Sequence, residues 1–249
     1  MYTIAALSFM LSFWACSAER QTEYSDSWQY AINHPDSSLS SLYSPEVISL
    51  NADGMTIKGR SEVVVADKHQ FRKILSVDTL FSIVATRDSS YTYEILELMG
   101  ADSQRYRQLV IFDERSSSHL RELEFNVAFT EGATPDTIEL NQRRQEWMNL
   151  CQAHNAAELV RNLYADDALY FNQNNKPRLI HGREALISEY DYMNRPEYQL
   201  TLTPLYISAV QQDLIYEIGQ CSGSYGGKYI LVWQHLPGHP WEILFDSNI

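Results

Sequence analysis

Two carboxylates in the carboxyl-terminal half stand in segments that are otherwise largely apolar. Glu217 lies in the stretch LIYEIGQC, and Asp246 lies in the stretch EILFD. Burial among apolar side chains disfavours the charged form of a carboxyl group and raises its pKa toward neutrality. A carboxylate with such a pKa can act as a general base. Glu217 and Asp246 are therefore the candidate catalytic residues. The alternative for each is a solvated carboxylate on the outer face of a sheet, or one paired with Arg183.

Aromatic and histidine side chains in the same half are candidates for lining a ligand pocket. Small-molecule pockets are mostly apolar and hold a few placed polar groups. Ordinary core packing is the alternative for the aromatic residues. For the histidine, on the apolar face of a predicted helix, the alternative is a hydrogen-bonded core position. The candidate pocket residues are Tyr164, His154, Tyr190, Tyr216 and Trp233.

Composition and motifs argue against several other kinds of site. The chain has 19 basic and 32 acidic residues and a formal net charge of −13. Binding nucleic acid requires clustered Lys and Arg, so we expect no nucleic-acid partner. The histidines and cysteines lack the spacing of metal ligands, and we expect no metal site. Phosphate-loop and dinucleotide fingerprints are absent from the sequence, so we expect no cofactor.

The first sixteen residues are typical of a cleaved targeting segment. Residues 4–15 are almost wholly apolar, and a run of about twelve is too short to span a bilayer but suits a secretory signal. Ala15 followed by Cys16 resembles the lipobox of bacterial lipoproteins. This resemblance implies an acylated Cys16, attachment to a membrane through the lipid and, because Ser17 is not aspartate, the outer membrane of a bacterial cell envelope. The alternative is an ordinary cleaved signal in which Cys16 has no role.

Two further cysteines, Cys151 and Cys221, follow Cys16 in the chain. A pair outside the cytoplasm can form a disulfide, but two cysteines make no disulfide framework. We favour two separate buried thiols.

The chain contains two diverged copies of one unit. The pairs Gly59-Arg60 and Gly182-Arg183 lie 123 positions apart, and so do the triplets at 93–95 and 216–218, which both read YEI. A segment rich in Gly, Pro and acidic residues separates the copies. We therefore predict a signal at 1–16, a first domain at 22–130, a linker at 131–138 and a second domain at 139–249.

The repeat also ranks the two carboxylates. Glu94 occupies the place of Glu217 in the first copy, whereas Asn126 occupies the place of Asp246. A feature kept in both copies more often serves the architecture of the unit. Asp246 is therefore the stronger catalytic candidate.

The second copy has the clearer pattern of secondary structure. Apolar spacing predicts two short helices over residues 138–164, with a break near His154, and another helix over 182–193. Stretches rich in β-branched and aromatic residues, bounded by turn residues, predict strands. These strands are expected at 167–171, 178–180, 198–210, 214–222, 228–236 and 241–247. Helices followed by a meander of antiparallel strands indicate an α+β unit.

The phrases LYADDALYF, HGREAL, YEIG and GKYILVW carry a resemblance. Over residues 139–249 the chain resembles the SnoaL-like branch of the nuclear transport factor 2-like superfamily, and the first copy resembles it through the repeat. This implies two tandem cone-shaped domains, each a curved, mostly antiparallel sheet wrapped around N-terminal helices, with a pocket at the wide end. It also implies that a catalytic carboxylate would work beside a phenol, from Tyr164, Tyr190 or Tyr216.

Two functions are compatible with these features. The first is a lipid-anchored envelope protein that binds a small apolar ligand or a protein partner without catalysis. The alternative is an enzyme in the second domain, isomerase-like or hydratase-like, that acts on a small carbonyl compound. Sheet faces of this superfamily often pair, so we also expect an intramolecular pseudo-dimer or a homodimer.

Overall fold

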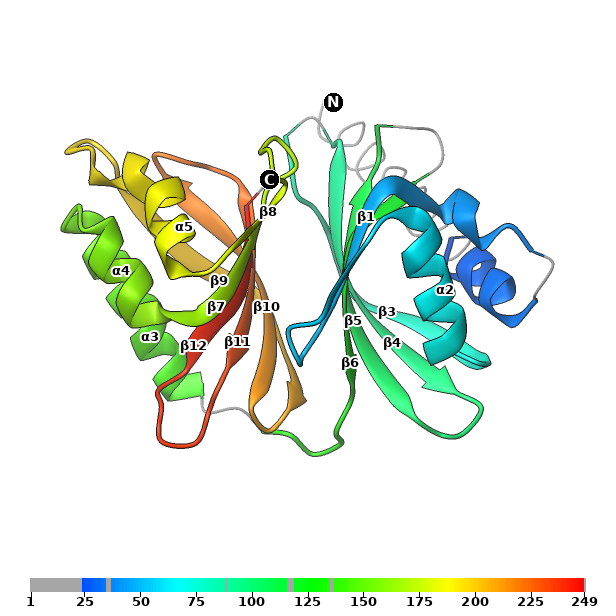
Figure 1. The fold of residues 1–249 in the computed structure, drawn as a ribbon. Helices are drawn as coiled ribbons and strands as arrows, with labels where there is room; N and C mark the ends of the chain where they lie inside the picture. The colour runs from blue at the N-terminus through cyan, green and yellow to red at the C-terminus, as the bar shows by residue number, and fades with distance from the viewer. Residues whose placement is uncertain (1–23, 35–36, 88, 116–118, 135–136, 249) are drawn as a thin grey trace, which may run out of the picture. The chain divides into compact units, whose positions relative to one another are not determined.

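A computed structural model describes residues 24–34, 37–87, 89–115, 119–134 and 137–248. The predicted signal segment 1–16 and Cys16 lie outside these residues. The chain divides into two compact units, Met1–Ser82 with Glu94–Asn126, and Ile83–Tyr93 with Val127–Ile249. Each unit has a six-stranded mixed sheet with helices on one face (Figure 1). Both units are therefore α+β, as the sequence predicts.

The second unit begins with the two predicted helices, α3 (Thr137–Gln152) and α4 (Ala156–Leu163). Between them, the side chain of Asn155 accepts a hydrogen bond from the Glu158 backbone N–H at 3.1 Å and caps α4. A third helix, α5 (Arg183–Glu189), continues into a 3-10 turn, η2 (Tyr190–Asn194). The strands are β7 (Tyr164–Phe171), β8 (Leu179–His181), β9 (Leu200–Gln211), β10 (Leu214–Gly223), β11 (Lys228–Gln234) and β12 (Glu242–Ser247).

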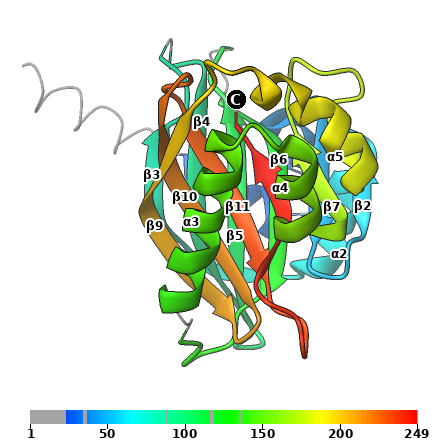
Figure 2. The ribbon, with the colours of Figure 1, turned by 90° about the vertical axis from the view of Figure 1, so that its left-hand side faces the viewer.

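The order of the strands across this sheet is β8-β7-β12-β11-β10-β9. Neighbouring strands pair in antiparallel fashion, except that β12 and β7 are parallel. Figure 2 shows α3 crossing the face of β9, β10 and β11, with α4 and α5 beside it. One face of the sheet therefore meets the helices, and the side chains on that face enter the interior of the unit.

The first unit repeats this arrangement. A helix covers residues 24–33, followed by a 3-10 turn, η1 (Leu39–Leu42), and a later helix, α2 (Arg60–Gln70). The sheet order is β2-β1-β6-β5-β4-β3, with β1 and β6 parallel. The strands are β1 (Tyr43–Asn51), β2 (Thr56–Lys58), β3 (Ile74–Val84), β4 (Tyr91–Gly100), β5 (Arg105–Asp113) and β6 (Leu120–Ala128).

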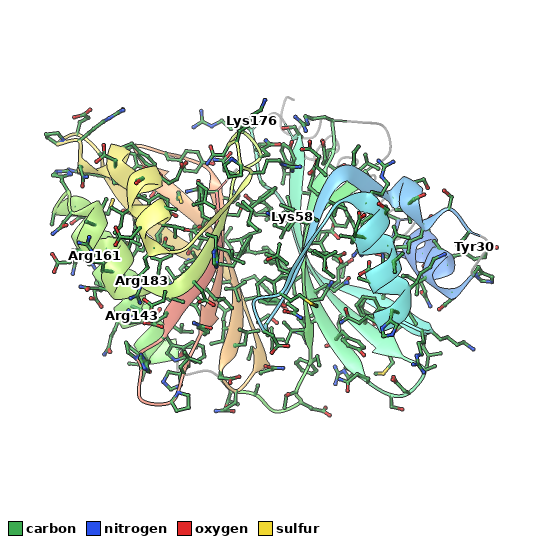
Figure 3. All side chains as sticks on the ribbon, in the orientation of Figure 1. Tyr30, Lys58, Arg143, Arg161, Lys176 and Arg183 are labelled. Carbon is green, nitrogen blue, oxygen red and sulfur yellow. The ribbon has the colours of Figure 1, made fainter. Side chains whose placement is uncertain are left out.

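The repeated Gly-Arg pair has a structural role. Gly59 and Gly182 immediately precede α2 and α5 with φ angles of 94° and 86°, a conformation that favours glycine. Arg183, labelled in Figure 3, forms ion pairs with Asp166 at 2.5 Å and Glu242 at 3.3 Å. Its Nε also donates to the carbonyl of Tyr164 at 2.6 Å. This arginine therefore joins the start of α5 to β7 and β12.

Both cysteines of the second unit are buried and unpaired. Cys151 lies near the end of α3 and Cys221 lies on β10, and neither forms a disulfide with any residue that the structure describes. This confirms the prediction of separate buried thiols.

Candidate functional site

The pairing of strands defines which residues share the interior face of the second sheet. Glu217 pairs with Leu231, Leu231 pairs with Asp246, and Asp246 pairs with Tyr170. Directly paired residues point to the same face of a sheet. Side chains from α3 and η2 contact this row, so it faces the helices. Glu217 and Asp246 are two strands apart, about 10 Å at the backbone, from the usual strand spacing.

Asp246 lies in a buried cluster with two tyrosines. The Tyr164 hydroxyl donates to its Oδ2 at 2.7 Å, and the Tyr190 hydroxyl donates to the same oxygen. The two hydroxyl oxygens are 3.2 Å apart. Trp147 of α3 donates through Nε1 to the Tyr164 hydroxyl at 3.3 Å. Three candidate residues, on β7, η2 and β12, are thus brought into direct contact.

Burial sets the protonation of this cluster. Asp246 is 4% exposed, and burial raises its pKa to about 6 against the opposing effect of the hydrogen bonds from Tyr164 and Tyr190. Burial, followed by the charge of Asp246, raises the pKa of both phenols well above the usual value. The tyrosines therefore remain neutral donors. The carboxyl group gains or loses its proton within the physiological range.

Glu217 lies in a separate buried cluster, where it is paired with a cation. The Nε of Arg144 lies 2.9 Å from its Oε1 and 3.1 Å from its Oε2. The Tyr229 hydroxyl donates to Oε1 at 2.7 Å, and Trp233 Nε1 donates to Oε2 at 3.0 Å. Both carboxylate oxygens are thus occupied by donors from α3 and β11. This arrangement is typical of a structural ion pair rather than of a base awaiting a substrate.

The other predicted site residues fall in different places. Trp233 belongs to the Glu217 cluster, not to that of Asp246. Tyr216 pairs with Val232 and Ser208 on the opposite face of the sheet from Glu217. His154 lies beyond the end of α3, in a left-handed turn with φ of 55°, and is half-buried rather than on the inward face of the helix. Its Nδ1 is buried and has no hydrogen-bond partner among the residues that the structure describes.

Sequence reasoning missed Arg144. This residue occupies the inward stripe of α3 together with Leu140, Trp147 and Cys151, all of them buried. The spacing of four, three and four residues places Arg144 on one helical stripe with three apolar residues, and the neighbouring Arg143 is buried as well. A cation at such a position requires a buried partner, and this signal was available in the sequence.

The first unit contains a matching cluster. Trp28 donates through Nε1 to the Tyr43 hydroxyl at 2.7 Å, and that hydroxyl donates to Oδ2 of Asp67. All three residues are buried. Burial, and then the charge of Glu124, raises the pKa of Asp67 well above its usual range. Each unit therefore contains a chain from tryptophan to tyrosine to a carboxyl group.

The remainder of the first interior is more polar than the second. The row across the sheet that corresponds to Glu217, Leu231 and Asp246 reads Glu94, Gln108 and Asn126 in the first copy. Gln108 donates to Asn126 at 2.7 Å. Arg121 pairs with Glu124 at 2.9 Å and lies 4.4 Å from the centre of the Trp28 ring.

Metal-binding clusters and membrane-spanning helices are both absent from the described ranges. These residues include no group of three or more His, Cys, Asp or Glu side chains placed to hold a metal ion. The same residues contain no helix with the length and apolar character needed to cross a membrane.

Comparison with known proteins finds distant structural similarity but no sequence match. No protein-family model and no curated protein matches the sequence. Among solved structures, a nuclear transport factor 2-like protein of unknown function from Shewanella oneidensis is 12% identical, with 45% of this chain and 98% of that chain covered and a TM-score of 0.40. A similar protein of unknown function from Pseudomonas putida is 15% identical, with 44% and 82% covered and a TM-score of 0.35.

A third solved structure, a candidate scytalone dehydratase from Novosphingobium aromaticivorans, is 11% identical, with 45% and 81% covered and a TM-score of 0.37. Identities this low concern the fold alone. The chain itself consists of two similar units, each with a six-stranded mixed sheet in the same strand order.

Proposed function

We propose that this protein is a lipid-anchored protein of the cell envelope whose second unit binds a small, mostly apolar ligand without catalysis. The Asp246 cluster would contact the polar group of that ligand. The observation that carries the proposal is that Asp246 Oδ2 accepts from both Tyr164 and Tyr190 in a buried setting. Such a cluster provides a fixed donor and acceptor pattern within an apolar interior.

The hydrogen bonds of the cluster favour binding over catalysis. A general base must have a free lone pair directed at the substrate proton, and a phenol that stabilises an oxyanion must donate to the substrate. Here both phenols donate to the carboxylate instead. Because Tyr164, Tyr190 and Asp246 are at most 4% exposed, a ligand reaches them by displacing neighbouring side chains.

A thermal-shift screen tests the proposal. The panel contains neutral bicyclic phenols and ketones, and each compound is added to the wild-type protein and to Asp246→Asn. A compound that raises the Tm of the wild type, raises that of Asp246→Asn by less, and is converted by neither protein supports binding at this cluster without catalysis. If no compound in the panel raises the Tm, the result argues against a small apolar ligand. The remaining alternative is then that this protein binds a protein partner.

The pKa of Asp246, raised to about 6, favours proton transfer on a small carbonyl compound as the second candidate function. In that case the wild-type protein exchanges an α-hydrogen of a ketone with solvent deuterium, and Asp246→Asn does not. Exchange that persists in Asp246→Asn would remove Asp246 as the base.

The proposed lipid anchor is Cys16, which lies outside the described residues. Its support is the apolar segment before it and the small Ala15 beside it. Labelled palmitate should enter the wild-type protein but not Cys16→Ser when both are produced in a bacterium that processes lipoproteins. Equal labelling of the two proteins would exclude this residue as the acylation site, and outer-membrane fractionation tests the location separately.

A further inference from the structure

The first unit contains a pocket at the end of α2. The pocket has a volume of about 300 Å³ and is formed where the segment after α2 meets the turn between β4 and β5. This volume is at the lower end of the range for small-molecule sites. All of its lining residues belong to the first unit. It is therefore separate from the Asp246 cluster, and a ligand bound in it would not depend on the function proposed for that cluster.

A half-buried tyrosine forms part of the pocket wall and rests on a buried phenylalanine. Phe71 and Tyr106 meet edge to face with their ring centres 5.1 Å apart. Phe71 is held from behind by Trp28, whose ring centre is 5.7 Å away. Tyr106 is half-buried, and burial followed by the charge of Asp102 raises the pKa of its hydroxyl. Phe71 is 1% exposed and supports the Tyr106 ring from inside, so Tyr106 supplies the accessible apolar surface and a neutral hydroxyl donor.

The pocket lining also carries two cations without an ion-pair partner. Arg72 and Lys73 are exposed, and neither forms a salt bridge within the described part of the chain. The acidic residue of the lining is Asp102, whose Oδ1 accepts from the Gln104 backbone N–H at 3.0 Å. Counting Arg72, Lys73 and Asp102, the lining has a net charge of one positive. In a chain of net charge −13, this is a local site of attraction for an anion.

Hydrogen bonds hold the segment that forms this wall. The Ala101 backbone N–H donates to the Lys73 carbonyl at 3.0 Å, which joins the β4–β5 turn to the segment after α2. Asn33 accepts from the Ile74 backbone N–H at 2.8 Å and donates to the Ile74 carbonyl at 2.8 Å. The pocket is thus braced from two elements and needs little ordering when a ligand binds.

We propose that this pocket binds an aromatic carboxylate, with its ring against Tyr106 and its carboxylate beside Arg72 and Lys73. The Tyr106 ring favours a flat apolar group, and the net positive charge of the lining favours a negative charge on the ligand. The partially exposed position of the cations means that the charge contributes modestly and in a salt-dependent manner.

Isothermal titration calorimetry of the full-length chain with 2-naphthoate tests this inference, and the neutral isostere 2-naphthamide serves as the matched ligand. We expect naphthoate to bind more tightly than naphthamide, and its affinity to fall when NaCl is raised from 50 to 500 mM. The double variant Arg72→Gln/Lys73→Gln should weaken naphthoate binding by about threefold to tenfold. The same variant should leave the naphthamide affinity unchanged.

A control double variant, Lys58→Gln/Arg195→Gln, removes the same charge from exposed sites elsewhere in the chain, and naphthoate should bind to it as to the wild type (Lys58 is labelled in Figure 3). Equal affinity for naphthoate and naphthamide, or equal weakening by both double variants, would overturn the proposal. Changes in the chemical shifts of backbone amide NMR signals show where naphthoate binds. Naphthoate should shift Gly100 and Ala101, and shifts confined to the second unit would place the ligand elsewhere.

Discussion

Asp67 and Asp246 accept hydrogen bonds from equivalent tyrosines, Tyr43 and Tyr164, but reach them from different elements. Asp67 is on α2, at the position that Tyr190 occupies in the second copy, whereas Asp246 is on β12, where the first copy has Asn126. The carboxyl group that accepts from the tyrosine hydroxyl therefore lies on a different element in each copy. In both copies the hydroxyl donates to one such carboxyl group.

A physical reason lies in the cost of burial. A second acidic group at the same hydroxyl would add a like charge that the interior does not solvate. The additional carboxylate of the first unit, Glu124, is accompanied by Arg121 at 2.9 Å. The two units therefore differ in chemistry although their folds match.

Removing the tyrosine hydroxyl should destabilise both units to a similar extent. Tyr164→Phe leaves Trp147 Nε1 without an acceptor and removes one donor from Asp246, and a buried polar atom without its partner costs about 1–3 kcal/mol. We expect the free energy of unfolding, measured by urea denaturation, to fall by about 2 kcal/mol, and likewise for Tyr43→Phe. Tyr30→Phe, at an exposed position, is the control and should change it little.

The stability of the second unit should depend on pH through Asp246. Its folded pKa of about 6 exceeds the unfolded value of about 3.9, so the folded state binds the proton more tightly. The stabilising effect of that proton is complete below pH 4 and is lost as the pH rises through 6. The wild-type protein should therefore lose about 2–3 kcal/mol relative to Asp246→Asn between pH 4 and 7. Parallel pH profiles for the two proteins would contradict the raised pKa.

Removing one charge of the Arg144–Glu217 ion pair should destabilise the protein more than removing both. Arg144→Met leaves a buried carboxylate without its cation, which costs about 3–5 kcal/mol. The double variant Arg144→Met/Glu217→Met removes both charges and should recover most of that loss. Chemical denaturation of the wild type, the two single variants Arg144→Met and Glu217→Met, and the double variant gives the coupling energy. Additive effects of the single substitutions would exclude a direct interaction between these side chains.

Gly219 should be intolerant of a side chain because Tyr229 lies over it. A Cβ at this position would be 2.1 Å from Cζ of the Tyr229 ring, whose hydroxyl holds Glu217. Gly219→Ala should displace the ring and lower the unfolding free energy by about 1–3 kcal/mol. In a Tyr229→Leu background the same substitution should cost much less. A cost that does not depend on residue 229 would show that another contact is responsible.

The two interior thiols should be unreactive in the folded protein. Burial raises the pKa of Cys151 and raises that of Cys221 to about 12, so the thiolate is scarce at pH 8. In a Cys16→Ser background, Ellman's reagent should react with both only after addition of guanidinium chloride. Rapid reaction of the native protein at pH 8 would indicate that this part of the second unit opens readily.

Much of the second unit was predictable because turn-forming residues mark the ends of its helices and strands. Asp213 and the pair Pro237-Gly238 mark turns, and helical spacing identified the helices on both sides of His154. The faces of the sheet were not predictable, since both alternating sets on β10 are largely apolar: Tyr216 and Ile218 on one side, Ile215 and Glu217 on the other. Only the contacts with α3 and η2 distinguish them.

The cluster in the first unit was harder to predict from the sequence. Asp67 occupies the position of a tyrosine in the second copy, so comparing the two copies gave no indication of a buried carboxyl group there. Its role depends on the position of the Tyr43 hydroxyl, which belongs to another element. Local pattern does not contain that information, because long-range packing decides which buried polar groups meet.

The strand that carries Asp246 is the last strand of its sheet in the sequence. β12 lies between β7 and β11, and it pairs in parallel with a strand that precedes it by more than seventy residues. During synthesis, β7 and the β9–β11 meander leave the ribosome as two separate pieces with exposed edges. Such non-local closure is slow and leaves partly folded chains open to association with one another. β6 lies between β1 and β5 in the same way, so each sheet is complete only after the last strand of its unit has been synthesised.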